Sequence, residues 1–255
     1  MINPLITIVT PSYNQGQFIE QTIQSILNQT YSPIQYIIVD GGSNDNTMSV
    51  VEKYKDQIDI IIHEPDKGQS DAINKGFQLA KGELVGWVNS DDYLDPRCVE
   101  CIVDLYQKDP QAAIYYGSTL NFVDDKGAKI QTKSIVIPNK DHLIHNDYDI
   151  IQVGSFYNTQ ILREVGFLDE KKHYCMDLDL WIRLLDKNII YHFNDYPLAN
   201  FRIWEESKTC SARSKFMADI IDTLKKAGAR TCDSTLIKAR YYSLKFLLMK
   251  LLLNR

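Results

Sequence analysis

Long apolar runs, a cysteine framework and an excess of positive charge are all missing from this chain of 255 residues. No run approaches the roughly 18 apolar residues that a transmembrane helix needs. The first ten residues lack the basic region and long apolar core of a signal peptide, so we expect a cytoplasmic protein. The net charge is −5, whereas general nucleic-acid binders are usually basic, so we expect no nucleic-acid partner.

The five cysteines have no spacing typical of a disulfide framework or a zinc site. The closest pair falls in a stretch that predicts a helix, and no second pair matches it, although a zinc site usually needs four ligands. We therefore expect reduced, buried thiols. The cysteines are Cys98, Cys101, Cys175, Cys210 and Cys232.

Charge is distributed unevenly along the chain. Residues 208–255 contain 11 basic and 3 acidic residues, whereas residues 1–207 contain 17 basic and 30 acidic residues. The segment 241–253 is aromatic, aliphatic and basic, which suits peripheral contact of residues 236–255 with the inner face of the cell membrane. A helix packed on the body, or in a homodimer, explains the same pattern, and helical periodicity does not separate these alternatives.

The first 117 residues alternate between short β-rich runs and helical segments of about ten residues. This alternation predicts an α/β fold in which right-handed crossovers build a mostly parallel central sheet flanked by helices. Its apolar strands suit cover on both faces. Strands are expected at 5–10, 36–39, 58–62, 84–88 and 113–117, and helices at 18–29, 45–54, 69–80 and 96–108.

The pattern loosens after residue 117. A turn signal at 124–127 lies between two strand-like runs and predicts a hairpin. From residue 211 onward the chain predicts a C-terminal helical extension. Further strands are expected at 153–158, 189–193 and 198–203, and further helices at 159–165 and 177–186.

Polar residues gather where three of the predicted parallel strands end. Because the carboxyl ends of such strands share one edge of the sheet, Asp40, Asp91 and Asp92 are expected on one rim. Clustered carboxylates repel unless a cation or polar groups compensate, so we predict a site for Mn²⁺ or Mg²⁺ and a hydroxylated ligand. Each motif alone is also consistent with a turn or a helix cap. The three motifs occupy residues 10–14, 40–45 and 89–92.

In their order and spacing, these motifs resemble the family-2 glycosyltransferases with a GT-A fold. The resemblance covers residues 5–210 and implies a GT-A domain over 1–210, with a nucleotide-sugar-binding half (1–117) and an acceptor half (118–210) before the extension at 211–255. The matching segments are TPSYN at 10–14, DGGSNDNT at 40–47, DAINKG at 71–76, AKGE at 80–83, NSDD at 89–92, GFLDE at 166–170 and DLDLWIRL at 177–184.

The resemblance also implies which residues bind the donor. Residues 11–13 resemble the loop that holds the base and ribose. Asp40 resembles the acid that reads the base, and Lys67 a neighbour of the diphosphate. In the DXD-like motif the first acid, Asp91, touches the ribose, and Asp92 is the implied ligand of Mn²⁺ or Mg²⁺. The implied donor residues are Pro11, Ser12, Tyr13, Asp40, Gly41, Lys67, Asp71, Asn74, Asn89, Asp91 and Asp92.

Asp177 resembles the family's general base, which usually follows a glutamate; Met176 stands in that place here. The implied reaction is inverting transfer of a hexosyl or N-acetylhexosaminyl group from a nucleoside-diphosphate sugar. A carboxylate takes the proton of an acceptor hydroxyl while the metal neutralises the leaving diphosphate. The implied acceptor is a saccharide or a lipid-linked saccharide, in the biosynthesis of surface polysaccharide, lipopolysaccharide or another glycolipid.

Several positions have two interpretations. Arg183 steadies the diphosphate or forms a helical salt bridge, and Trp181 is an acceptor platform or part of the core. Arg202 and residues 207–209 resemble the family's closing strand and loop, but Trp204 replaces a histidine that in many relatives reaches the metal or diphosphate. Because Met176 and Trp204 depart from the pattern, a carbohydrate- or lipid-binding relative without catalysis is one alternative. A nucleotidyltransferase is a weaker one, since no glycine- and arginine-rich loop follows the first strand.

Overall fold

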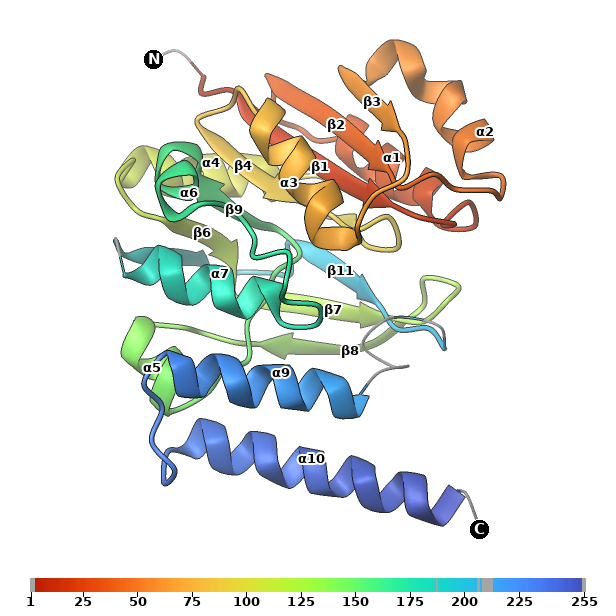
Figure 1. Cartoon of the computed structure of the whole chain (residues 1–255). Coiled ribbons are helices and arrows are strands. Elements are labelled where there is room, and N and C mark those ends of the chain that lie inside the picture. Colours follow the sequence, from red (N-terminus) through yellow and green to blue (C-terminus); the bar gives the residue numbers. More distant parts are fainter. Residues whose placement is uncertain (1–2, 187, 206, 208–212, 254–255) are drawn as a thin grey trace.

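The computed structural model describes residues 3–186, 188–205, 207 and 213–253, and its centre is a seven-stranded sheet (Figure 1). The strands follow the order β10-β6-β9-β4-β1-β2-β3, and every pair is parallel except those that β9 makes with β4 and β6. The predicted mostly parallel sheet is thus confirmed, with one reversed strand. The strands are β1 (Ile6–Ser12), β2 (Ile34–Asp40), β3 (Ile60–His63), β4 (Leu84–Trp87), β6 (Ile114–Gly117), β9 (Ser155–Asn158) and β10 (Ile190–Phe193).

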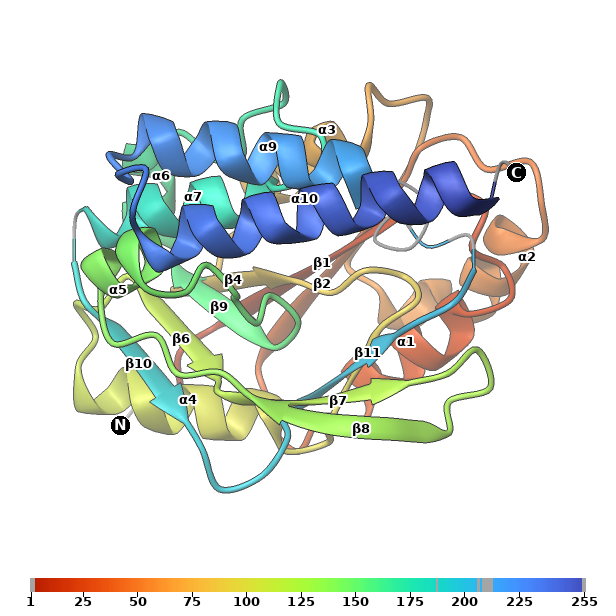
Figure 2. The ribbon, with the colours of Figure 1, turned by 90° about the horizontal axis from the view of Figure 1, so that it is seen from below.

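Helices cover both faces of this sheet, as its apolar strands require. All seven residues of β1 are buried. The views place α3, α6 and α7 on one face and α1 and α4 on the other (Figures 1 and 2). These helices are α1 (Ile19–Leu27), α3 (Gln69–Leu79), α4 (Cys98–Lys108), α6 (Thr159–Val165) and α7 (Met176–Leu185), while α2 (Thr47–Val51) continues as a 3₁₀ helix (Glu52–Gln57) beside α1.

The prediction of buried, free thiols is confirmed for three of the four described cysteines and is wrong on burial for Cys232. Cys98, Cys101 and Cys175 are buried free thiols, and Cys232 is an exposed one. Cys98 and Cys101 both lie on α4, as expected. Cys210 lies outside the described residues.

Strand register brings the predicted motifs to one edge. In the pairing of β1 with β2, Ser12 lies opposite Asp40, so these two strands end together. On the other side of β1, β4 ends at Trp87, just before the motif Asn89–Asp92. The three polar segments therefore follow the carboxyl ends of three neighbouring strands.

A second sheet of four strands begins directly after the motif Asn89–Asp92. It follows the order β5-β11-β7-β8, and β7 and β8 form the hairpin predicted at residues 124–127. The short strand β5 was not predicted; it begins directly after Asp92 and pairs with β11. The strands are β5 (Tyr93–Leu94), β7 (Thr119–Val123), β8 (Lys129–Ser134) and β11 (Ala199–Arg202).

Two helices form the predicted C-terminal extension. α9 (Arg213–Lys226) contacts α7, and α10 (Ser234–Leu253) packs on α9 and on the short helix α5 (Lys140–His145), which was not predicted. α10 is the outermost layer in Figure 1. None of the helices in the described part of the chain combines the length and apolar character needed to cross a bilayer.

Candidate active site

Two loops join along the ends of β1 and β2. The Gly41 amide donates to the Ser12 carbonyl at 2.8 Å, the Asn14 amide donates to Ser43 Oγ at 2.7 Å, and the Asn44 amide donates to Asn14 Oδ1 at 2.9 Å. Asn14 adopts a φ of +52°, a conformation that asparagine tolerates better than most residues. The result is a cross-linked platform at the edge of the sheet.

Ser12 and Tyr13 are neighbours at the end of β1 and each has a feature that a ligand could use. The Ser12 hydroxyl is buried and has no hydrogen-bond partner in the described part of the chain, an arrangement that usually calls for an explanation. Tyr13 exposes 58% of its surface next to it. A ligand with a hydroxyl and a flat ring would satisfy the first and stack on the second.

Asp40 lies on the predicted rim but turns inward. Its side chain is fully buried. The carboxylate accepts from the amides of Gly42 and Ser43 at 3.1 and 2.8 Å and from Ser43 Oγ at 2.5 Å. His63 Nδ1 lies 2.7 Å from Asp40 Oδ2. The carboxylate therefore shapes the glycine loop, and its assignment to the base of the donor stays a prediction.

Asp66 was missed by the sequence analysis. A Cβ atom added to Gly41 would lie 2.3 Å from Asp66 Oδ2, so a larger residue here would push the Asp66 carboxylate out of its present position. Asp66 Oδ1 accepts from the Gly68 amide at 2.8 Å, and the side chain is partly exposed. The position of Asp66 in the sequence could have indicated it, because Asp66 follows β3 as the predicted motifs follow the other strands.

The two acids of the DXD-like motif differ in burial. Asp92 is 1% exposed; its Oδ1 accepts from the Arg202 amide at 2.9 Å and its Oδ2 from Asn89 Nδ2 at 3.1 Å. Burial raises the pKa of the Asp92 carboxyl well above its ordinary value, and the charge of Asp91 adds to the rise. Each oxygen accepts one hydrogen bond and keeps a further lone pair, so the assignment of Asp92 as a metal ligand stays a prediction.

Asp91 is partly exposed and its Oδ2 accepts from Trp204 Nε1 at 2.9 Å. Burial raises the pKa of Asp91, and the Trp204 hydrogen bond acts against that rise. An indole N–H only donates, so Trp204 cannot ligate a cation as a histidine would. Trp204 instead packs edge-on against Phe18 and orients the Asp91 carboxylate.

Arg202 fastens this motif to its surroundings. Its Nε donates to the Asp91 carbonyl at 2.8 Å, and one of its terminal nitrogens donates to the carbonyls of Asp124 and Asp125. The guanidinium also lies 4.6 Å from the centre of the Phe18 ring. The predicted closing strand thus holds the acidic loop in place. Of the loop predicted to follow it, Lys208 and Thr209 lie outside the described residues.

The three predicted acids do not form a closed metal site. In residues 3–186, 188–205, 207 and 213–253, no group of three or more His, Cys, Asp and Glu side chains is arranged to hold a cation. Asp40 and Asp91 follow strands that flank β1, and two interstrand spacings amount to about 10 Å. A cation at this edge would need ligands from another molecule as well.

Two of the remaining predicted donor residues fasten the backbone instead. Asp71 accepts from the Lys67 amide at 3.0 Å and lies 3.6 Å from Lys75, so it closes the turn into α3. Asn74 is buried, and its amide group exchanges two 3.0 Å hydrogen bonds with the backbone of Leu168. Both side chains thus have partners within the protein, and their contact with the donor stays a prediction.

Lys67 lines an open cleft of about 790 Å³ between α3 and the connection from α6 to α7. Asn74 and Arg183 also line it, whereas Asp40, Asp91 and Asp92 do not.

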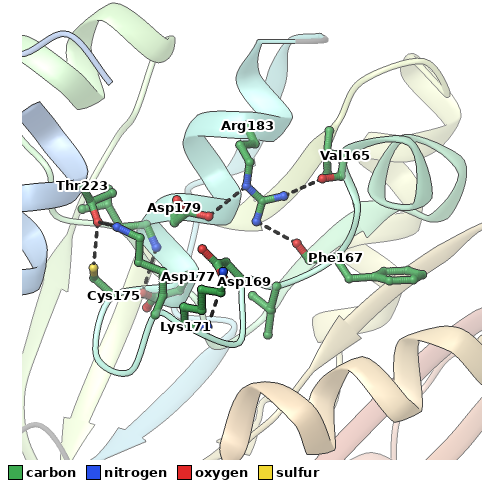
Figure 3. Close-up of polar contacts among 12 residues, drawn as sticks. Val165, Phe167, Asp169, Lys171, Cys175, Asp177, Asp179, Arg183 and Thr223 are labelled. Atoms are coloured by element: carbon green, nitrogen blue, oxygen red, sulfur yellow. Dashed lines mark hydrogen bonds and ion pairs between the residues drawn. The ribbon is translucent and has the colours of Figure 1, made fainter. Parts of the chain in front are cut away.

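Asp177 lies in the first turn of α7 and is partly exposed (Figure 3). Its Oδ1 accepts from the Leu178 amide at 2.8 Å. Met176, which replaces the usual glutamate, is buried, and its sulfur accepts from Ser70 Oγ at 2.9 Å. The substitution therefore joins the start of α7 to the start of α3.

Arg183 secures the connection that leads to Asp177. Its Nε donates to Asp179 Oδ2 at 2.9 Å, and its two terminal nitrogens donate to the carbonyls of Val165 and Phe167 at 2.8 and 2.7 Å (Figure 3). The helical salt bridge is the interpretation that the structure supports. Trp181 is likewise a core residue: it is fully buried and donates to the Tyr157 hydroxyl.

The C-terminal extension holds the same connection from its other side. Thr223 of α9 accepts from Lys172 Nζ at 2.6 Å, and its hydroxyl lies 3.2 Å from the Cys175 sulfur (Figure 3). Asp219 accepts from the Tyr174 amide at 3.3 Å. The loop that precedes Asp177 is thus tied to α9.

Replacing Arg183 with lysine should lower stability, because a lysine cannot make all three hydrogen bonds at once. Losing the bonds to two backbone carbonyls should cost about 1–3 kcal/mol, a fall of roughly 3–8 °C in Tm by thermal unfolding. The control is Arg163→Lys, because Arg163 donates one such bond, to the Ala80 carbonyl at 2.7 Å. Equal melting temperatures for the two variants would contradict the role given to Arg183.

Comparison with known sequences places the chain among glycosyltransferases. It is 28% identical over 222 residues to an uncharacterized glycosyltransferase of Rickettsia typhi, a match that covers 82% of this chain and 67% of the relative. It is also 28% identical over 197 residues to the chondroitin synthase of Pasteurella multocida (strain Pm70), covering 75% of this chain but 20% of that protein. The chain thus spans a fifth of the synthase.

Solved structures share the fold at low identity. The complex of S. aureus TarS (residues 1–349) with UDP-GlcNAc matches with a TM-score of 0.69 and 17% identity, covering 95% of this chain and 71% of that one. The mannosyltransferase PcManGT from Pyrobaculum calidifontis, in complex with GDP-Man and Mn²⁺, matches with a TM-score of 0.70 and 15% identity, covering 95% and 70%. Both likenesses confirm the predicted fold class.

The family profile described as glycosyl transferase family 2 matches residues 7–166, which is more than half of the sequence. The match spans β1, β2 and β4 and the polar segments at their ends. The chain therefore belongs to glycosyl transferase family 2.

Proposed function

We propose that this protein transfers a sugar from a nucleoside-diphosphate sugar to an acceptor hydroxyl, with inversion at the anomeric carbon. The observation that carries the proposal is the convergence of three segments, Ser12–Tyr13, Gly41–Ser43 and Asn89–Asp92, at the carboxyl ends of three neighbouring strands. Ligands of open parallel sheets bind at such an edge. The solved relatives support the donor class, since their complexes contain UDP, UDP-GlcNAc and GDP-Man.

The donor lies on this edge, over the platform of the first two loops. The base stacks on the exposed Tyr13, and the ribose meets the buried Ser12 hydroxyl, which gains a hydrogen-bond partner. Asp66, close over Gly41, is placed to accept from an N–H of the base. Asp40 acts indirectly by holding the loop that these groups share.

A divalent cation belongs to the same site, and we assign its protein ligand to Asp91. The partly exposed Asp91 fits Mn²⁺ or Mg²⁺, which commonly bind through one or two carboxylates completed by diphosphate oxygens and water. The bound ion would neutralise the charge that develops on the leaving diphosphate. Asp92 supports Asp91 indirectly, because it accepts from the amide of Arg202, whose side chain donates to the Asp91 carbonyl.

Asp177 is the general base in this proposal. An acceptor hydroxyl is a poor nucleophile at neutral pH, so a positioned carboxylate must take its proton as the new bond forms. The first turn of α7 presents Asp177 with partial exposure, and the ties from Arg183 and Thr223 hold the segments beside it. A single displacement needs no covalent sugar–enzyme intermediate.

The acceptor half and the location of the protein also belong to the proposal. Residues 1–117 bind the donor, residues 118–210 bind the acceptor, and residues 211–255 are an extension that stabilises the second half. The acceptor is a saccharide or a lipid-linked saccharide of a surface polysaccharide, and the protein works in the cytoplasm. The likeness to a chondroitin synthase supports a polysaccharide product.

Thermal unfolding with UDP-, GDP-, dTDP- and CDP-linked sugars, each with Mn²⁺, Mg²⁺ or a chelator, tests this function. One nucleotide should raise Tm by about 5 °C or more at a hundredfold excess over Kd, because a ligand that binds only the folded state stabilises it. Nucleotide release should then follow with the same donor. A folded protein that no nucleotide stabilises would refute the proposal, and binding without release would identify a relative that lost catalysis.

A further inference from the structure

An exposed apolar stripe runs along α10, the outermost layer of the protein (Figure 1). Its side chains recur at intervals of three and four residues, so they share one side of the helix. Each exposes at least half of its surface. The stripe consists of Ile237, Tyr241, Leu244 and Leu248, and Leu247, which is also half exposed, widens it on one side.

The other side of α10 is fixed to the body, which keeps the stripe outward. Leu236 and Ala239 are buried. Lys238 reaches Asp147 and Asp149 at 2.7 and 2.8 Å, so this lysine is paired within the protein. Figure 2 shows α10 lying along α9 in front of the sheet. The stripe is therefore the outer side of a helix whose inner side already packs on the body.

The charge of α10 indicates what covers the stripe. The helix contains four basic residues and no acidic residue. Of these, Arg240 and Lys245 are exposed, and they flank Tyr241 and Leu244 in the sequence. Apolar side chains mixed with lysine and arginine are typical of helices that lie in the interface of an anionic membrane.

We propose that the outer side of α10 binds an anionic lipid surface, with the helix axis in the plane of the membrane. The apolar stripe enters the headgroup region while Arg240 and Lys245 meet lipid phosphates. A second copy of the chain is a poorer occupant, because two α10 helices packed on each other would bring basic residues together without acidic partners on either helix.

Membrane contact at α10 would place α7, which carries Asp177, near the lipid. α9 lies between α10 and the loop before Asp177, and it contacts both α10 and α7. A lipid-linked acceptor would then reach the enzyme from the same surface. This last step rests on the proposed function, whereas lipid binding itself does not.

Co-sedimentation of the full chain with vesicles tests the proposal. The vesicles contain phosphatidylcholine alone or phosphatidylcholine enriched in phosphatidylglycerol. Leu244→Glu and Leu248→Glu should each lower partition onto the anionic vesicles by about tenfold or more, because each removes an exposed leucine that would enter the membrane and adds a charge that anionic lipid repels. The matched control is Ile130→Glu on β8, where the side chain has the same 56% exposure as Leu244. This variant should bind as the wild type does.

Four results would overturn the proposal. The wild type would fail to bind anionic vesicles, or bind phosphatidylcholine vesicles equally well. Ile130→Glu would weaken binding as much as Leu244→Glu. Alternatively, the wild type would sediment as a dimer that Leu244→Glu converts to a monomer without any change in vesicle binding. Melting temperatures show that each variant is folded, and nucleotide release with a soluble acceptor separates a failure of lipid binding from a failure of the proposed function.

Discussion

Asp177→Asn should lower the rate of sugar transfer by about 10²–10⁴-fold, the usual contribution of a general base. The amide has almost the same shape as the carboxylate but cannot take a proton from the acceptor hydroxyl. Donor binding should survive, because Asp177 belongs to α7 and lies outside the platform formed by the ends of β1 and β2. We expect kcat to fall while the donor KM changes little, as measured in a coupled nucleotide-release assay.

The control for this variant is Asp186→Asn at the other end of α7. Asp186 forms an exposed ion pair with Lys140, and such pairs contribute little to stability. Transfer by this variant should stay close to the wild-type rate. Normal turnover in Asp177→Asn would reject Asp177 as the base. Loss of donor-induced thermal stabilisation in that variant would instead indicate that the substitution damages the fold or the donor site.

The sequence predicted the central sheet well because its signals are local. Apolar runs such as Ile6–Val9 and Tyr36–Val39 specify strands buried on both faces, and the segments between them have a helical period. Pairing partners are not a local property. The reversed direction of β9 and the two-residue strand β5 depend on neighbours tens of residues away. No periodicity within these short segments could predict them.

The positions of the site residues were easier to predict than the directions in which their side chains point. Residue type and spacing placed Asp40 and Asp92 correctly at strand ends. The Asp40 carboxylate turns inward onto the amides of the next loop residues, with the more distant His63 beside it. The Asp92 carboxylate accepts from the Arg202 amide, 110 residues away. Asn74, which the motif assigns to the donor, also bonds to the backbone of Leu168, 94 residues away. Such pairings follow from the tertiary fold and have no motif.

Substitutions of the two neighbouring acids of the DXD-like motif should affect different properties, donor binding in one case and stability in the other. Asp91→Ala should weaken donor binding in Mn²⁺ by at least about tenfold and slow transfer by about 10²–10³-fold, because the charge of the leaving diphosphate loses its compensation. Its melting temperature should fall less than that of Asp92→Ala, because the Asp91 side chain is partly exposed, although Trp204 Nε1 loses its acceptor. Titration with the donor, with Mn²⁺ or with a chelator, measures the first effect.

Asp92→Ala should act on the fold first. The substitution leaves the Arg202 amide buried without its acceptor, at a cost of about 1–3 kcal/mol, or roughly 3–8 °C in Tm. The fraction that stays folded should retain some metal-dependent donor binding, because Asp91 keeps its carboxylate. The opposite pattern would restore the assignment made from the motif alone. In that pattern, Asp92→Ala melts like the wild type but loses all response to Mn²⁺, while Asp91→Ala keeps it. The buried carboxylate would then have to exchange its hydrogen bonds for the cation when the donor binds.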